Sequence, residues 1–175
     1  QILAGSQARQ AFGYSMVVAD FDNDGNVDLA VGAPYTDVTS VDNGAVMIYA
    51  GLPNGFFADT PHQTLAGLYG YDRFGFAMDT CDINGDGVSD LIISAYTAED
   101  RSALVRSDNQ GAIHVFYGGT SGFSDKPDHS IWGTSWYDGE WVGAPSLSLG
   151  MTLVTGDFNG NGTCDIAAGT YTWDW

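Results

Sequence analysis

The sequence has few basic residues and no long apolar run. Its 5 lysines and arginines stand against 22 aspartates and glutamates, so the formal net charge is −17 over 175 residues. Nucleic acid and anionic membrane surfaces are poor partners for so acidic a chain, and we predict neither. No stretch approaches the roughly 18 apolar residues of a membrane-spanning helix, so we also predict no membrane insertion.

Signals for catalysis are missing as well. The sequence has no nucleophile elbow, phosphate-binding loop or zinc-ligand spacing. The three histidines, His62, His114 and His129, fall at unrelated places in the chain, and we expect His114 to be packed or to lie at a strand edge. We therefore predict that this chain is not an enzyme, while a catalytic domain outside it stays compatible with the sequence.

There are only two cysteines, Cys81 and Cys164. A disulfide between them requires neighbouring parts of the fold to bring them within bonding distance. Two separate buried thiols are the alternative, and the sequence leaves both open. The chain begins with Gln1 rather than methionine, which we interpret as a processed product or a piece of a longer protein.

One nine-residue pattern, D-x-[DN]-x-[DN]-G-x-x-D, occurs three times. Oxygen-bearing side chains occupy positions 1, 3, 5 and 9, and position 7 varies, as expected if only its carbonyl binds. Glycine at position 6 permits a sharp turn. This set suits Ca²⁺, which takes about six to eight oxygen ligands. The predicted ligands of three Ca²⁺ sites are Asp20, Asp22, Asp24, Asn26 and Asp28; Asp82, Asn84, Asp86, Val88 and Asp90; and Asp157, Asn159, Asn161, Thr163 and Asp165.

Two alternatives to these calcium loops can be weighed. An EF-hand needs a glutamate at position 12 and flanking helices, but position 12 is Val31, Ile93 or Ala168, each in a short apolar run. A turn without metal is the other alternative, because Asp, Asn and Gly favour turns. Three copies in one register argue against it.

The repeat extends beyond the metal loops. Each unit contains four short strands: one before the loop, one after it, a Gly-Ala run, and one ending in Leu-x-Gly or a variant. Together with 24 glycines, this pattern predicts an all-β fold, a β-propeller of four-stranded antiparallel blades. A β-sandwich is the competing architecture, but it does not require three copies of one loop.

Counting strands gives about two whole blades and parts of two others. We predict an outer strand of a preceding blade at residues 1–5, blades at 12–67 and 74–133, and the first half of a further blade at 149–175. A closed ring needs about 4–8 blades. The expected partners are therefore the remaining blades of a longer polypeptide, with assembly of several copies as the alternative.

Phe12-Gly13, the loop at 20–28 and Gly32-Ala33-Pro34 together resemble the FG-GAP repeat. This repeat is the blade unit of integrin α-subunit propellers and of the C-terminal part of glycosylphosphatidylinositol-specific phospholipase D. The resemblance covers nearly the whole chain, although the later copies of Gly-Ala-Pro are degraded. It implies a seven-bladed propeller with Ca²⁺ in these loops, usually extracellular or at the cell surface.

Two loops on the face opposite the metal are longer in the second unit, at about 96–110 and 134–148. The second of them contains Trp136, Tyr137 and Trp141, which we take as candidate ligand-binding residues because loops on a rigid scaffold often carry binding. Packing of these aromatics on their own blade is the alternative.

We therefore predict an extracellular, calcium-binding propeller for adhesion, assembly or binding of a protein or glycan ligand, with structural calcium. A carbohydrate-binding propeller and a non-catalytic propeller attached to an enzyme such as a phospholipase are the alternatives.

Overall fold

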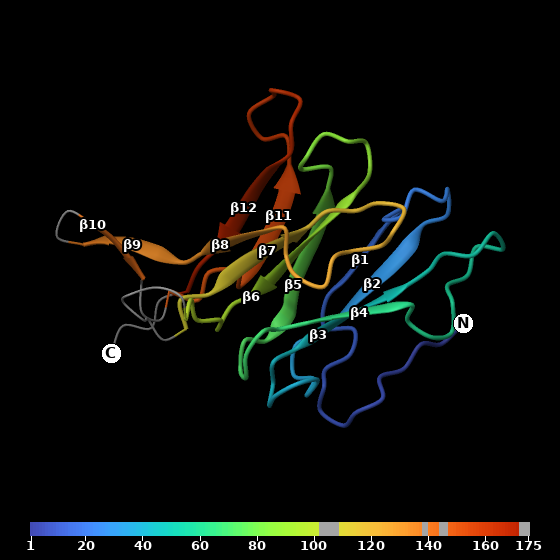
Figure 1. The fold of residues 1–175 in the computed structure, drawn as a ribbon, viewed down its shortest axis with the longest axis horizontal. Coiled ribbons are helices and arrows are strands. Elements are labelled where there is room, and N and C mark those ends of the chain that lie inside the picture. The colour runs from blue at the N-terminus through green and yellow to red at the C-terminus, as the bar shows by residue number, and fades with distance from the viewer. Residues whose placement is uncertain (102–108, 138–139, 144–146, 172–175) are drawn as a thin grey trace.

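A computed structural model describes residues 1–101, 109–137, 140–143 and 147–171. All regular structure in these residues is β-strand (Figure 1). Nowhere in the described ranges is there a helix long and apolar enough to cross a membrane. The predicted all-β class is confirmed.

The strands form two four-stranded antiparallel sheets and two smaller ones. The first sheet contains β1 (Met16–Ala19), β2 (Asp28–Ala33), β3 (Ala45–Tyr49) and β4 (Gln63–Ala66). The second contains β5 (Phe74–Cys81), β6 (Asp90–Ala95), β7 (Ala112–Phe116) and β8 (His129–Trp132). In both, the strands pair in chain order, as a propeller blade requires. The third repeat contributes β11 (Thr152–Gly156) and β12 (Asp165–Gly169).

The two four-stranded sheets and the β11–β12 pair fall within the ranges 12–67, 74–133 and 149–175, and the other two-stranded sheet lies between the last two ranges. Residues 1–5 form no strand in the structure. An outer strand needs a neighbouring strand to complete its hydrogen bonds, and the Gln1 side chain instead bonds to the Phe57 carbonyl and the Asp59 carboxylate. The assignment of residues 1–5 to a preceding blade stays a prediction.

The sheets pack face to face because their inner strands are apolar on both faces. Every residue of β6 is buried. Leu91 and Ile93 join the core shared with the first sheet. Ile92, between them in sequence, packs in a second cluster with Leu153 of β11 and Ile166 of β12. Successive side chains of a strand point to opposite faces of its sheet, so β6 packs against a neighbouring sheet on each side.

A parallel contact repeats between successive sheets. Gly44 bridges Phe74, and Gly111 bridges Leu149 in the same way. Gly44 has a φ of +78°, and a Cβ on it would lie 2.3 Å from the Phe74 carbonyl oxygen. The glycine that opens the Gly-Ala run is therefore required by the close approach of two backbones.

The residue before each Phe-Gly or Leu-Gly pair adopts a left-handed backbone. Its φ is 53° at Ala11, 55° at Arg73 and 50° at Ser148. Such values are uncommon outside glycine. Their recurrence shows that the conformation belongs to the repeat and does not depend on the side chain.

Cys81 and Cys164 form a disulfide, with their Cα atoms 6.3 Å apart. The bond settles the alternative that the sequence left open. It joins the end of β5 to the third metal loop, across 83 residues of chain.

The segment 134–148 was predicted to be one enlarged loop, and this was wrong in part. It contains β9 (Thr134–Tyr137) and β10 (Glu140–Gly143), which pair antiparallel with Trp136 opposite Trp141. The two residues between these strands are Asp138-Gly139, a strong two-residue hairpin signal in sequence. Residues 102–108 of the other enlarged loop lie outside the described residues.

Candidate calcium sites

The three metal loops lie at the same end of their sheets, between β1 and β2, β5 and β6, and β11 and β12 (Figure 1). Each loop joins the first two antiparallel strands of its sheet, so the three equivalent loops emerge at the same end. The loops share a network of backbone hydrogen bonds that holds the predicted ligands in place.

The aspartate at position 1 closes each loop. Asp20 accepts the N–H groups of Asp24 and Gly25, at 3.1 and 3.0 Å. The same bonds recur from Asp86 and Gly87 to Asp82, and from Asn161 and Gly162 to Asp157. The Gly162 N–H is the leading cause that holds the pKa of Asp157 below its usual value. The Asp157 carboxylate is thus kept ionised, as a Ca²⁺ ligand must be.

Positions 3 and 5 form consecutive side-chain turns. Asp22 accepts the Asp24 N–H at 3.1 Å, and Asp24 accepts the Asn26 N–H at 2.7 Å. The second and third loops repeat both bonds. Since each N–H of position 7 points back into its loop, position 7 has a fixed orientation. Use of its carbonyl as a ligand stays a prediction.

The aspartate at position 9 ties its loop to the rest of the sheet. Asp28 is buried, and it accepts the N–H of Phe21 within the loop and that of Gly51 after β3, at 3.0 and 2.8 Å. Asp90 is also buried and accepts the N–H of Ile83 at 2.8 Å and of Gly118, after β7, at 2.9 Å. This role of position 9 was not predicted from the sequence, although the glycine that donates to it recurs at the end of each Gly-Ala run.

The first loop brings three carboxylates together. Ligand atoms of Asp20, Asp22 and Asp28 all lie within 4.8 Å of one another. Burial, followed by the neighbouring charge of Asp28, raises the pKa of Asp22. Three close anions repel, and a divalent cation between them would relieve that repulsion. Asp24 lies outside this group, and its Oδ1 accepts both the backbone N–H and the side-chain amide of Asn26.

In the other two loops, position 3 is asparagine, and its side-chain amide donates hydrogen bonds within the loop. Asn84 donates through Nδ2 to Asp86 at 3.0 Å. Asn159 donates through Nδ2 to both carboxylate oxygens of Asp165, at 3.1 and 2.9 Å. Calcium binding in the third loop would have to displace these amide hydrogens. Elsewhere in the described ranges, no three carboxylate, histidine or cysteine groups lie as close as those of the first loop.

A cavity of about 340 Å³ lies between the second and third loops. Its lining includes Asp82, Asn84, Asp157 and Thr163, together with the disulfide. The disulfide therefore spans two predicted calcium sites, with Cys81 just before position 1 of one and Cys164 just before position 9 of the other.

His114 was expected to be packed or to lie at a strand edge, and the structure shows it packed. The side chain is buried, and burial lowers its pKa to about 4. Its Nδ1 lies 2.8 Å from Ser130 Oγ, and its ring packs against Phe74 and Trp132. His114 is thus a packed core residue, as expected. The ligand role of Trp136, Tyr137 and Trp141 stays a prediction.

Comparison with known proteins accounts for this arrangement. A model of the FG-GAP repeat matches residues 12–49 and 74–116, which are most of the first and second sheets. The chain carries FG-GAP repeats. Since the matched segments form four-stranded antiparallel sheets, these repeats identify the sheets as propeller blades.

Three relatives show how widely the FG-GAP chain matches. It is 34% identical to integrin alpha-PS2 of Drosophila melanogaster over 98% of its own length and 12% of the relative. It is 33% identical to human phosphatidylinositol-glycan-specific phospholipase D over 78% of its length and 16% of the relative. Mouse integrin alpha-7 is 31% identical over 97% of the chain and 13% of the relative. The FG-GAP chain thus spans less than a fifth of each of these proteins.

Proposed function

We propose that this chain is a calcium-binding part of an extracellular FG-GAP propeller, and that calcium serves to hold the blades' loops in shape. The observation that carries the proposal is the cluster of Asp20, Asp22 and Asp28, whose oxygens lie within 4.8 Å of one another. The backbone network that orients these groups recurs in the other two loops, which supports three Ca²⁺ sites.

A structural role for the ion follows from where the loops stand. Each loop joins two adjacent strands, and its carboxylates repel unless a cation neutralises them. An ion that binds only the folded chain stabilises it by about 2.7 kcal/mol per site when calcium is at about 100 times its dissociation constant.

The extracellular location rests on the disulfide. Cys81 and Cys164 are bonded, and such bonds persist in oxidising compartments while they are rare in the cytosol. The integrin and phospholipase relatives are consistent with the same location.

The proposed partners include further blades of the same ring. Met16 and Met78 occupy equivalent positions in the first strands of successive sheets, but Met16 is 62% exposed and Met78 only 9%. Met78 belongs to the core shared with the first sheet, whereas no sheet covers Met16 in the described residues. A preceding blade would cover Met16 in the same way. The ring would then act in adhesion, in assembly or in binding a protein or glycan ligand.

The test of the calcium role is thermal unfolding with and without a chelator. EDTA should lower the melting temperature, and calorimetry should detect three calcium ions per chain. Magnesium at the same concentration serves as the control for ionic strength. Unchanged stability in EDTA, or no calcium uptake, would contradict the proposal.

A second candidate is favoured by the phospholipase relatives. In that case the chain would be a non-catalytic propeller within a longer enzyme. A phospholipase assay on the longer protein separates the two functions, because activity is expected there only in the second case, whereas the isolated chain should be inactive in both.

A further inference from the structure

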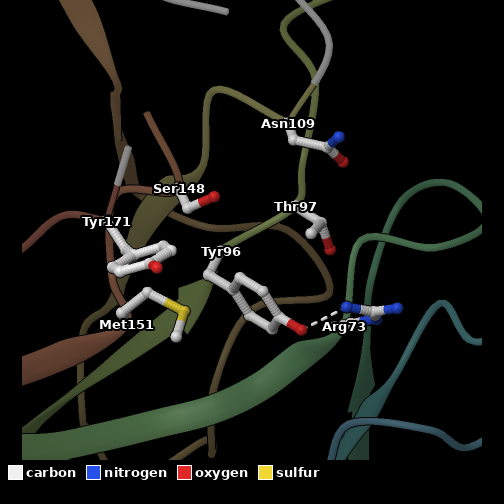
Figure 2. A pocket seen from close by; sticks show the side chains of 7 residues that line it. All are labelled: Arg73, Tyr96, Thr97, Asn109, Ser148, Met151 and Tyr171. Atoms are coloured by element: carbon white, nitrogen blue, oxygen red, sulfur yellow. Dashed lines mark hydrogen bonds between the residues drawn. The ribbon is translucent and has the colours of Figure 1, made fainter. Parts of the chain in front are cut away.

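A cavity of about 500 Å³ opens at the end of the sheets away from the metal loops (Figure 2). It lies between the second and third sheets. Arg73 reaches it from just before β5, Tyr96 and Thr97 from just after β6, and Ser148 and Met151 from just before β11. None of the predicted calcium ligands lines it.

Arg73 is held in one position at this cavity. Its Cζ atom lies 5.5 Å from the ring centroid of Tyr35 and 5.3 Å from that of Tyr96. Its Nη1 also donates a hydrogen bond to the Tyr96 hydroxyl, which points toward it in Figure 2. Two rings and a hydrogen bond thus orient the guanidinium before any ligand arrives.

The charge of Arg73 has no counterion within the described residues. Its Nε is buried and, across the same residues, has no hydrogen-bond partner. The adjacent carboxylate of Asp72 is turned instead to the N–H of Tyr69, at 2.8 Å. That enclosed nitrogen is out of reach of a ligand, but the positive charge of the guanidinium group, which no carboxylate of the described residues pairs with, favours an anion in the cavity.

The fold does not require arginine at this position. Ala11 and Ser148 stand at the equivalent places of the other repeats, with the same left-handed backbone. The three positions differ in chemistry while their backbone is shared. Arg73 is therefore a feature of this one site and not of the repeat.

We propose that this cavity binds the carboxylate of an aspartate or glutamate side chain from a partner protein. The guanidinium fork matches a carboxylate in two parallel hydrogen bonds. Asn109 and Ser148 line the cavity as further polar groups, and Met151 adds an apolar side chain to the lining. The inference rests on the proposed function as a ligand-binding module and specifies one contact that the module makes.

The lining favours an acidic side chain over an acidic sugar. A sugar acid presents several hydroxyl groups that each need a partner. Thr97 is already engaged, because its Oγ1 donates to the Tyr71 carbonyl oxygen at 2.5 Å. A single carboxylate on an otherwise apolar stem leaves fewer groups without partners.

The test is nuclear magnetic resonance on the calcium-loaded 175-residue chain, with the Arg73 Nε–H signal as the reporter. The probes are the capped tripeptides Gly-Asp-Gly and Gly-Asn-Gly, and free N-acetylneuraminic acid. We expect the aspartate peptide to shift the Arg73 signal saturably and the asparagine peptide to leave it unchanged. In Arg73→Ser, affinity for the aspartate peptide should fall about tenfold or more.

The repeat supplies matched controls for this variant. Serine and alanine already occupy the equivalent positions, so Arg73→Ser and Arg73→Ala should keep the melting temperature and the calcium uptake of the parent chain. Equal binding of both tripeptides, equal affinity in Arg73→Ser, or saturation by the sugar acid alone would overturn the proposal. Failure of calcium binding with intact peptide binding would count only against the proposed role of calcium.

Discussion

The carboxylate of Asp28 accepts the N–H of Gly51 at 2.8 Å, across 23 residues of chain. Its other oxygen accepts the N–H of Phe21, at 3.0 Å. One buried carboxylate thus closes the metal loop through Phe21 and joins the loop to Gly51, just after β3. Asp90 does the same for Ile83 and Gly118 in the second blade. Position 9 therefore has a structural task that does not need a metal.

Replacement of Asp28 should destabilise the fold even without calcium. Asp28→Ala leaves two N–H groups without their acceptor, and we expect the free energy of unfolding to fall by about 3 kcal/mol. Urea unfolding in EDTA measures the loss. Asp24→Ala is the matched control, since Asp24 is an exposed residue of the same loop and its replacement should cost less than about 1 kcal/mol in EDTA. Equal losses in the two variants would contradict a special role of position 9.

The three loops should differ in calcium affinity. The first has four carboxylates, the second three and the third two, and ligand charge raises affinity for calcium. The third loop must also release the Asn159 amide hydrogens from Asp165. As the chelator concentration rises, the third loop should therefore lose its calcium first and the first loop last, and calorimetry measures this order. If the third loop emptied last, loop rigidity would outweigh charge.

Loss of the disulfide should weaken the third blade most. A bond that closes 83 residues contributes up to about 4.5 kcal/mol by restricting the unfolded chain. Replacing Cys81 and Cys164 together by serine should lower stability and also the calcium affinity of the third loop, because Cys164 lies between two of its predicted ligands. The first loop is the internal control, and an equal fall in its affinity would point to general unfolding instead.

Acid should destabilise the protein through His114. Burial lowers the pKa of His114 to about 4 from 6.5, so the unfolded chain binds a proton between these values and the folded chain does not. The stabilising contribution, about 3 kcal/mol, is complete above pH 6.5 and is lost as the pH falls toward 4.

His114→Met isolates this contribution, because Met47 holds the equivalent position in the first blade. Between pH 7.5 and 4, the free energy of unfolding should fall further in the parent than in the variant, by about 3 kcal/mol. The comparison also cancels the opposite effect of Asp72, whose pKa is raised to about 6 by burial. A constant difference between the two proteins would exclude His114 as the titrating group.

The blade architecture was predictable because the pattern of metal loop and flanking strands recurs three times in the sequence. Strand bounds followed from the glycines at 44 and 111, which the structure requires for close approach to Phe74 and Leu149. The β9–β10 pair was missed because it has no counterpart in the other repeats, although the Asp138-Gly139 dipeptide signals a hairpin. The disulfide depended on the three-dimensional distance between two blades, which sequence alone did not supply.

The metal loops were predictable as candidate calcium sites, but which of their predicted ligands lie close together was not. The structure groups Asp20, Asp22 and Asp28 and sets Asp24 aside, a difference that depends on side-chain positions and not on residue type. The cavity at Arg73 had no signal in sequence, because its residues come from separate connections that meet only where two sheets adjoin.

The recurring left-handed residue before each Phe-Gly or Leu-Gly pair bears on how such a protein can change. Ala11, Arg73 and Ser148 share one backbone conformation despite unlike side chains. The side chain at this position can therefore change by a single substitution, while the glycines and buried aspartates that hold the blades stay as they are. If Arg73 binds a carboxylate as proposed, related proteins can acquire a different ligand at this position without a change of fold.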